Sequence, residues 1–183
     1  SDDPEVVARF EREARTASAI GDEHIVEVFD AGVTEDGRSY LVMELLIGLS
    51  LSDVAEATGP MPAARAVPIV RQVLRGLAAA HAKGIVHRDM KPENIFVTTT
   101  PQGEDIPKLL DRHDFVKIMD FGISKFLQDR ESKVRLTATG AVIGTPVYMA
   151  PEQAMGTGEI DARVDLYAVG VMLYELLAGR PPF

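Results

Sequence analysis

Two stretches of sequence decide the fold of this chain: HRDMKPEN at His87–Asn94 and DFG at Asp120–Gly122. In the first stretch, Asp89 can accept a proton from a hydroxyl group and Lys91 can neutralise charge on a phosphate. Phosphoryl transfer from a magnesium nucleotide depends on positioning and charge neutralisation of this kind. The alternative is a polar surface turn, which any three charged residues would favour and which the complete octapeptide argues against.

The same stretches contain candidate metal ligands. Asn94 offers an amide oxygen and Asp120 a carboxylate, and Mg²⁺ prefers oxygen ligands. An isolated Asp-Phe-Gly also suits an ordinary turn. Here it follows the first motif across two predicted strands, Ile95–Val97 and Val116–Met119. We therefore interpret Asp120 as a carboxylate that joins the metal to the phosphates of a nucleotide.

Composition excludes several other classes of function. The chain has 183 residues, no cysteine and a formal net charge of −9. Without cysteine there is no disulfide, thiolate metal site or thiol nucleophile. The negative charge and the dispersed basic residues disfavour nucleic acid as a partner. The longest apolar stretch, Leu166–Ala178, contains Glu175 and is too short to cross a bilayer, so we expect no membrane contact from this segment.

Hydrophobic spacing predicts strands in the first part of the chain. Ile25–Phe29 and Ser39–Leu45 have the composition of two strands, joined by a turn at Asp36–Gly37. Before them, apolar residues recur at helical spacing from Val6 to Ala17. After Gly48 the pattern becomes helical again.

Helices dominate the later part. A helix closed by Gly84 carries a predicted inward face made of Val67, Val70, Leu74, Leu77 and His81. Arg163–Leu177 is apolar nearly all round, which predicts a buried helix ending at Gly179. Between these helices, Thr98–Phe115 is a polar loop. The order of elements indicates an α+β class with two unequal parts.

The four histidines suggest no metal cluster. We interpret His81 and His87 as packed structural residues, and His24 and His113 as surface or turn residues.

These motifs resemble those of the protein kinase family, over essentially the whole chain. GTPVYMAPE at Gly144–Glu152 resembles the peptide-binding loop, and the segment from Val164 to Phe183 resembles the central buried helix and the turn after it. YLVMEL at Tyr40–Leu45 resembles the strand that leads into the hinge. HRDMKPEN, DFGISK and VIGTPVYMAPEQ are most similar to the motifs of bacterial serine/threonine kinases.

The resemblance implies a two-lobe protein-kinase fold that is truncated here. We expect residues 1–43 to be a remnant of the N-lobe, 44–48 the hinge and 49–183 an incomplete C-lobe. No glycine-rich loop and no ATP-contacting lysine precede Glu13. We therefore expect the isolated piece to be weakly active or inactive and marginally stable.

Carried over by position, the resemblance assigns the catalytic residues. Asp89 matches the catalytic base, Lys91 stands beside it, and Asn94 and Asp120 match the metal ligands. Asp165 matches an aspartate that braces the backbone of the catalytic loop; a buried carboxylate requires a partner in any case.

A second group of positions matches residues that contact the nucleotide. Glu13 matches the helix glutamate that pairs with the ATP-contacting lysine, and Met43 matches the gatekeeper. Glu44 and Leu46 would offer backbone groups to adenine. Asp53 matches the ribose contact, and Phe96 matches the floor under the base. The alternatives are a solvated acid at Glu13, an acidic helix cap at Asp53 and a core aromatic at Phe96.

The loop between the motifs carries the expected substrate and regulatory positions. Thr145 matches a threonine that hydrogen-bonds toward Asp89 and Lys91. We predict phosphorylation at Thr137 or Thr139, because Arg88 could pair with the added phosphate. Ser132 is a third candidate, and simple exposed hydroxyls are the alternative.

The resemblance implies transfer of the γ-phosphoryl group of ATP to serine or threonine hydroxyls of protein substrates. By the same resemblance, we expect the protein to use ATP with Mg²⁺ or Mn²⁺ as cofactors and to be cytoplasmic. Its expected partners are nucleotide and protein substrates. Two alternatives stay open. One is a noncatalytic kinase-like domain that binds nucleotide or protein, and the other is a small-molecule phosphotransferase of related fold.

Overall fold

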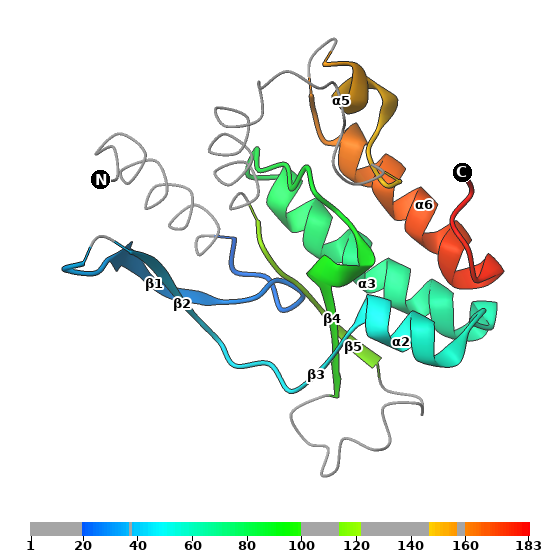
Figure 1. Cartoon of the computed structure of the whole chain (residues 1–183), viewed down its shortest axis with the longest axis horizontal. Helices are drawn as coiled ribbons and strands as arrows, with labels where there is room; N and C mark the ends of the chain where they lie inside the picture. Colours follow the sequence, from blue (N-terminus) through cyan, green and yellow to red (C-terminus); the bar gives the residue numbers. More distant parts are fainter. Residues whose placement is uncertain (1–19, 37, 100–113, 122–146, 157–159) are drawn as a thin grey trace.

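The computed structural model describes residues 20–36, 38–99, 114–121, 147–156 and 160–183. Their strands form two sheets. β1 (Val28–Val33) and β2 (Ser39–Met43) pair antiparallel, while β3 (Gly48–Ser50), β4 (Ile95–Thr99) and β5 (Asp114–Ile118) form an antiparallel sheet in that order. Figure 1 shows the β1–β2 pair extending away from the helices.

The helices confirm the α+β class. α2 and α3 follow β3, a short 3₁₀ helix η1 precedes β4, and α5 and α6 end the chain. Their bounds are Leu51–Thr58 for α2, Ala63–His81 for α3, Pro92–Asn94 for η1, Pro151–Met155 for α5 and Arg163–Ala178 for α6. Within the described ranges, no helix is both long enough and apolar enough to span a membrane.

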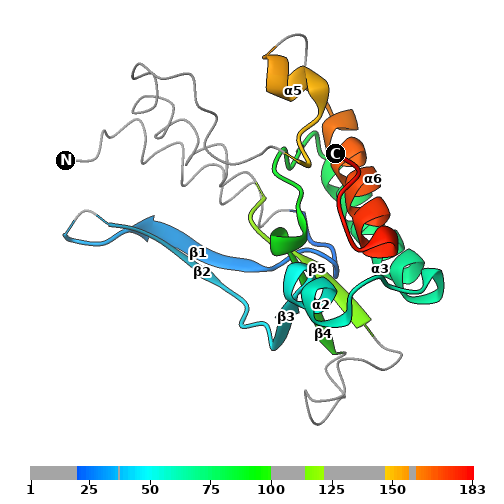
Figure 2. The same cartoon turned by 45° about the vertical axis from the view of Figure 1, so that its right-hand side comes forward.

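The core lies around α3, which packs against β5 and against α6 (Figure 2). A close approach to β5 depends on Gly76, since a Cβ atom there would lie 2.8 Å from Cδ1 of Ile118. Gly48 allows a similar approach of β3 to β4, because a Cβ atom there would clash with the Val97 carbonyl oxygen. Both glycines therefore allow close packing among α3, β3, β4 and β5.

The predicted inward face of α3 is wrong at two positions. Val67 and Leu74 are 44% and 37% exposed, whereas Leu77 and Val70 are buried as predicted. The buried face consists of Ala66, Ile69, Val70, Val73, Gly76, Leu77 and Ala80. Small residues on this stripe let the sheet approach closely, so packing selects it over the stripe richest in large apolar residues. His81, half-buried, lies at the end of the helix.

α6 is less buried than its composition predicts. Leu166, Tyr174 and Leu177 are each at least 40% exposed among the described residues, whereas Val164, Ala168 and Met172 are buried. The helix ends at Gly179 as predicted, with the glycine in the left-handed conformation at φ 72°.

The first strand begins later than predicted. Ile25 forms an isolated parallel bridge to Ile118, and the Val26 N–H donates to the Ile118 carbonyl. The apolar run from Ile25 to Phe29 therefore has two partners: its start pairs with β5, and β1 starts at Val28. The β3 strand was not predicted. β4 and β5 confirm the two strands expected at Ile95–Val97 and Val116–Met119, on either side of the polar loop.

Candidate active site

The loop between α3 and η1 is anchored by a buried carboxylate on α6. Asp165 is 1% exposed and accepts hydrogen bonds from the backbone N–H groups of His87 at 2.9 Å and Arg88 at 2.8 Å. Its Oδ2 atom also lies 2.7 Å from Nε2 of His81. These contacts supply the partner expected for a charge inside an apolar helix. They fix the loop to the core.

His87 connects this loop to the DFG segment. Its Nε2 atom lies 2.8 Å from the Met119 carbonyl oxygen, so Nε2 donates, and Nδ1 accepts from the Asp89 N–H at 3.3 Å. Complete burial lowers the pKa of His87 below its ordinary 6.5, against opposing effects of the Met119 carbonyl and of three nearby aspartates. The neutral ring also packs edge-on against Phe121, with ring centroids 4.7 Å apart.

Three predicted catalytic side chains meet at the end of the loop. Lys91 Nζ lies 3.0 Å from Asp89 Oδ2. The Asn94 side-chain amide donates to the Asp89 carbonyl at 2.8 Å and to Asp89 Oδ2 at 3.3 Å. Asn94 is buried, whereas the side chains of Asp89 and Lys91 are 31% and 36% exposed. A substrate can therefore reach the carboxylate and the ammonium group.

The oxygen donors fit a Mg²⁺ ion. Since the Asn94 amide nitrogen points to Asp89, the amide oxygen is the atom left to meet a metal. The Met119 N–H donates to the Asn94 carbonyl at 2.9 Å, which holds the residue before Asp120 beside η1. In the described ranges no three His, Cys, Asp or Glu side chains form a metal cluster. Mg²⁺ commonly takes one or two protein ligands and completes its shell with water and phosphate oxygens.

Met43, at the end of β2, faces a small cavity. It lines this apolar cavity together with Asp120 and Phe121. The other lining residues are Ile25, Val26, Val28 and Leu41. The cavity thus connects the end of β2 with the DFG segment.

The segment after Met43 is held by Glu44. The Glu44 N–H donates to the Glu27 carbonyl at 2.9 Å. The Glu44 carbonyl is therefore the backbone group that this residue can offer to a nucleotide base. Its carboxylate accepts from the Glu27 N–H at 2.8 Å and from Lys117 Nζ at 2.6 Å. Leu46 is half-buried in the same connection between β2 and β3.

Asp53 and Phe96 have structural contacts of their own. The Ser50 hydroxyl accepts from the Asp53 N–H at 3.0 Å and donates to its carboxylate at 2.6 Å, so both residues form the N-terminal cap of α2. Phe96 is half-buried on β4, and a Cβ on Gly48 would lie 3.0 Å from its ring. The acidic residue at the helix cap, which was the alternative for Asp53, is present, whereas Phe96 is not part of the buried core cluster. These placements do not preclude contacts with a ligand.

Five expected positions lie outside the described residues: Glu13, Ser132, Thr137, Thr139 and Thr145. Their roles stay predictions.

The histidine interpretation is wrong for His24. It is 3% exposed, with Nδ1 3.1 Å from the Val116 carbonyl and a ring that stacks on Phe115. The short segment around it packs on β5, which the polar neighbours of His24 in the sequence did not indicate. His113 lies outside the described residues.

Two further side-chain contacts near the site could not be predicted from the sequence. The Tyr148 hydroxyl donates to the Glu175 carboxylate at 2.6 Å, and burial followed by this bond raises the pKa of Tyr148. The Gln153 side-chain amide donates to the Arg88 carbonyl at 2.9 Å. Each contact joins residues far apart in the chain, so no local pattern could have indicated it.

The protein kinase domain family matches the chain over residues 1–183. The chain belongs to the protein kinase domain family. Among sequence relatives of this kinase domain is the serine/threonine-protein kinase Pkn1 of Myxococcus xanthus, 47% identical over 98% of the chain and 24% of the relative. Another is pkn3 of the same organism, 44% identical over 99% of the chain and 31% of the relative. PknB of Mycobacterium leprae is 42% identical over 99% and 27%.

Solved structures agree with this assignment. The kinase domain of Mycobacterium tuberculosis PknI matches with a TM-score of 0.70 and 27% identity, over 99% of this chain and 60% of that one. A structure of Rad53 in complex with AMP-PNP matches with a TM-score of 0.71 and 28% identity, over 96% of this chain and 39% of that one. The chain spans less than a third of the length of each of the three curated relatives named above.

Proposed function

We propose that the protein transfers the γ-phosphoryl group of ATP to serine or threonine hydroxyls of protein substrates. The observation that carries this proposal is the cluster of Asp89, Lys91 and Asn94 on a loop that α6 holds in place. The naming of the curated relatives as serine/threonine-protein kinases supports the choice of acceptor.

In the proposed reaction, the acceptor hydroxyl lies against the Asp89 carboxylate. A bond forms between the hydroxyl oxygen and the γ-phosphorus, and the bond from that phosphorus to the bridging oxygen of ADP breaks. The hydroxyl proton passes to Asp89. Lys91, 3.0 Å from Asp89, neutralises charge on the phosphoryl group and also keeps the carboxylate in position.

Asn94 and Asp120 would hold Mg²⁺. The ion, when bound, neutralises negative charge on the phosphates. The protein's own part is geometric: the Asn94 amide is oriented by Asp89, and Asp120 is held beside η1 through Met119. The same oxygen donors also suit Mn²⁺.

We assign the nucleotide base to the region of Met43, Glu44, Leu46 and Phe96, and its ribose to Asp53. Support comes from the cavity that joins Met43 to Asp120 and from the Glu44 carbonyl described above. That a Rad53 structure of the same fold contains AMP-PNP is consistent with this assignment.

The test uses the protein at its full natural length, ATP labelled in the γ-phosphate and a generic protein acceptor. We expect label on serine or threonine, with none on tyrosine, and loss of that label in Asp89→Asn. Binding of nucleotide without any transfer would favour the noncatalytic binding domain instead. Transfer only to small molecules would favour the small-molecule phosphotransferase.

A further inference from the structure

The residue before the proposed base has a strained backbone. Arg88 has φ 69°, in the left-handed region that residues other than glycine rarely adopt. Such a conformation persists only where the surrounding structure determines it. The question is therefore which groups hold Arg88.

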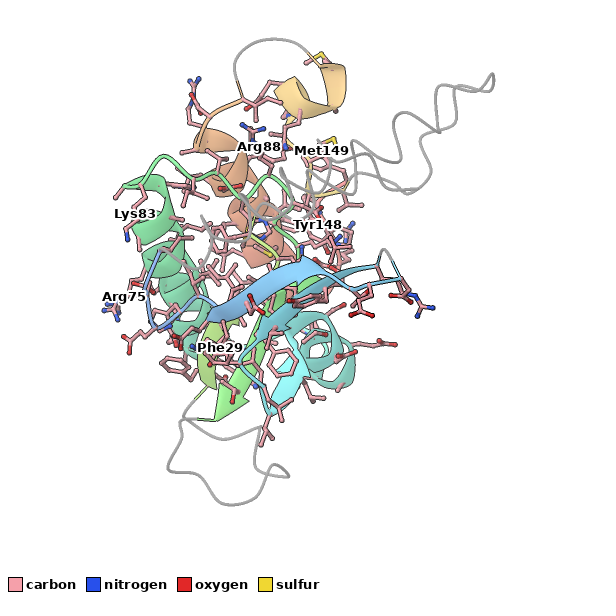
Figure 3. All side chains as sticks on the ribbon, turned by 90° about the vertical axis from the view of Figure 1, so that its left-hand side faces the viewer. Phe29, Arg75, Lys83, Arg88, Tyr148 and Met149 are labelled. Carbon is pink, nitrogen blue, oxygen red and sulfur yellow. The ribbon has the colours of Figure 1, made fainter. Side chains whose placement is uncertain are left out.

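Both polar backbone groups of Arg88 are hydrogen-bonded to side chains from other elements. Its N–H donates to Asp165 Oδ1 of α6 at 2.8 Å. Its carbonyl oxygen accepts from Gln153 Nε2 of α5 at 2.9 Å. Figure 3 shows Arg88 below α5.

The second bond controls the peptide unit that joins Arg88 to Asp89. The carbonyl side of this unit is held by Gln153, and its N–H side donates to Nδ1 of His87 at 3.3 Å. This unit ends at the Cα atom that carries the Asp89 side chain. The two contacts therefore hold the backbone at Asp89, whose carboxylate is contacted by Lys91 and Asn94.

Gln153 is itself fixed at both ends of its amide. Its Oε1 accepts from the Ala150 N–H at 3.2 Å, which is half of a capping box at the start of α5. A cap requires only the oxygen. The bond from the nitrogen to Arg88 is additional, and it reaches a residue 65 positions away in the sequence.

We propose that Gln153 is a positioning residue for phosphoryl transfer. It holds the Arg88 carbonyl from α5 and so couples the position of α5 to the orientation of Asp89. This inference rests on the proposed function. Displacements of about 1 Å in a catalytic group can lower a rate by up to roughly a hundredfold, so a side chain that never touches the substrate can still act on the rate.

Two variants of the full-length protein test the role. Gln153→Met keeps the length of the side chain and removes both bonds. Gln153→Glu keeps an acceptor for the Ala150 N–H but places an oxygen against the Arg88 carbonyl. We expect both to lower kcat by roughly ten- to a hundredfold and to leave the KM for ATP within about twofold.

Gln72 provides a matched control. It also bridges two elements through both ends of its amide, donating to the Asp114 carbonyl at 2.9 Å and accepting from the Val116 N–H at 3.1 Å. These contacts join α3 to β5, away from the catalytic loop. We expect Gln72→Met to lower Tm as Gln153→Met does while kcat stays unchanged.

Amide hydrogen exchange supplies a readout that needs no activity. Gln153→Met should speed exchange of the Arg88 and Asp89 amides, and Gln72→Met should not. If the wild-type protein transfers no phosphate, the proposed function fails. Hydrogen exchange still decides whether the bond from Gln153 to the Arg88 carbonyl stabilises the loop.

An unchanged kcat in Gln153→Met, or an equal loss in Gln72→Met, would overturn the positioning role. So would full activity in Gln153→Glu, because the cap alone would then suffice. If Gln153→Met does not fold, Gln153→Glu decides by the same criteria. An unchanged exchange rate of the Arg88 and Asp89 amides in a folded Gln153 variant would directly contradict stabilisation of the loop by Gln153.

Discussion

At the scale of single residues, the catalytic loop depends on a histidine that stays neutral. His87 donates from Nε2 to the Met119 carbonyl and accepts at Nδ1 from the Asp89 N–H. A protonated ring has two donors and no acceptor, so the Asp89 N–H would lose its partner. The loop is therefore built for the uncharged form, which burial also favours.

This predicts a pH dependence of stability. Because the pKa of His87 is lowered in the folded state, the unfolded chain binds the proton first as pH falls below about 6.5. The stability contributed by the neutral ring is present above pH 6.5. It is lost as pH falls toward the lowered pKa of the folded state. We expect the free energy of unfolding, measured with urea, to decrease between pH 7 and pH 5.5.

The matched variant is His87→Gln, which has a donor and an acceptor but does not titrate. Its free energy of unfolding should change less over the same interval. An equal slope in the two proteins would show that other groups cause the dependence.

At the scale of elements, α6 has one glycine in its interior and another directly after its last residue, in opposite situations. Gly170 lies inside the helix with open space around its position, whereas Gly179 ends the helix at φ 72°. A Cβ on Gly179 would also lie 2.7 Å from Cγ of Pro60. The first position tolerates a side chain and the second does not.

We therefore expect opposite effects from the same substitution. Gly170→Ala should raise the free energy of unfolding by about 0.5–1 kcal/mol, because alanine favours the helix interior. Gly179→Ala should lower it by more than ~1 kcal/mol, since the left-handed conformation strains a residue with a Cβ. Urea denaturation of both variants measures the difference. Two changes of the same sign would contradict the assigned helix end.

The sequence could indicate features that depend on neighbouring residues, and it could not indicate those that depend on contacts between distant parts of the chain. Asp89, Lys91 and Asn94 were predicted together because they share one short loop, and β4 and β5 because each is a local apolar run. A partner for Asp165 was expected from its place in an apolar helix, and the resemblance placed that partner in the backbone of the loop, where the structure has it. The face of α3 was wrong, because several apolar stripes compete on that helix and packing with small residues decides among them.

Long-range contacts were beyond reach of the sequence. His24 is buried because its segment packs on β5, and Gln153 reaches Arg88 across 65 positions. A polar side chain does not reveal its partner through periodicity. The division into residues 1–43, 44–48 and 49–183 likewise stays a prediction.

At the scale of the whole molecule, order should be distributed unevenly. α3, β4 and β5 contain residues of under 1% exposure, such as Ile69, Ile95 and Ile118. Among the described residues, β1 and β2 form a sheet of two strands, with Phe29 60% and Val42 45% exposed. A two-stranded sheet is marginally stable by itself.

Hydrogen exchange followed by mass spectrometry should show this difference. In the 183-residue chain, we expect amides of β1 and β2 to exchange much faster than those of α3, β4 and β5. Equal protection in both regions would mean that the hairpin belongs to the same cooperative unit as the core.

The central claim is that the loop ending in Asp89, Lys91 and Asn94 performs phosphoryl transfer. The most direct measurement is the single-turnover rate of phosphate transfer from ATP to a protein serine or threonine, in the full-length protein and in Asp89→Asn. Nucleotide affinity is measured alongside, because the substitution leaves Met43 and Glu44 in place. We predict a loss of at least roughly a hundredfold in the transfer rate with nucleotide affinity retained. An unchanged rate in Asp89→Asn would contradict the account.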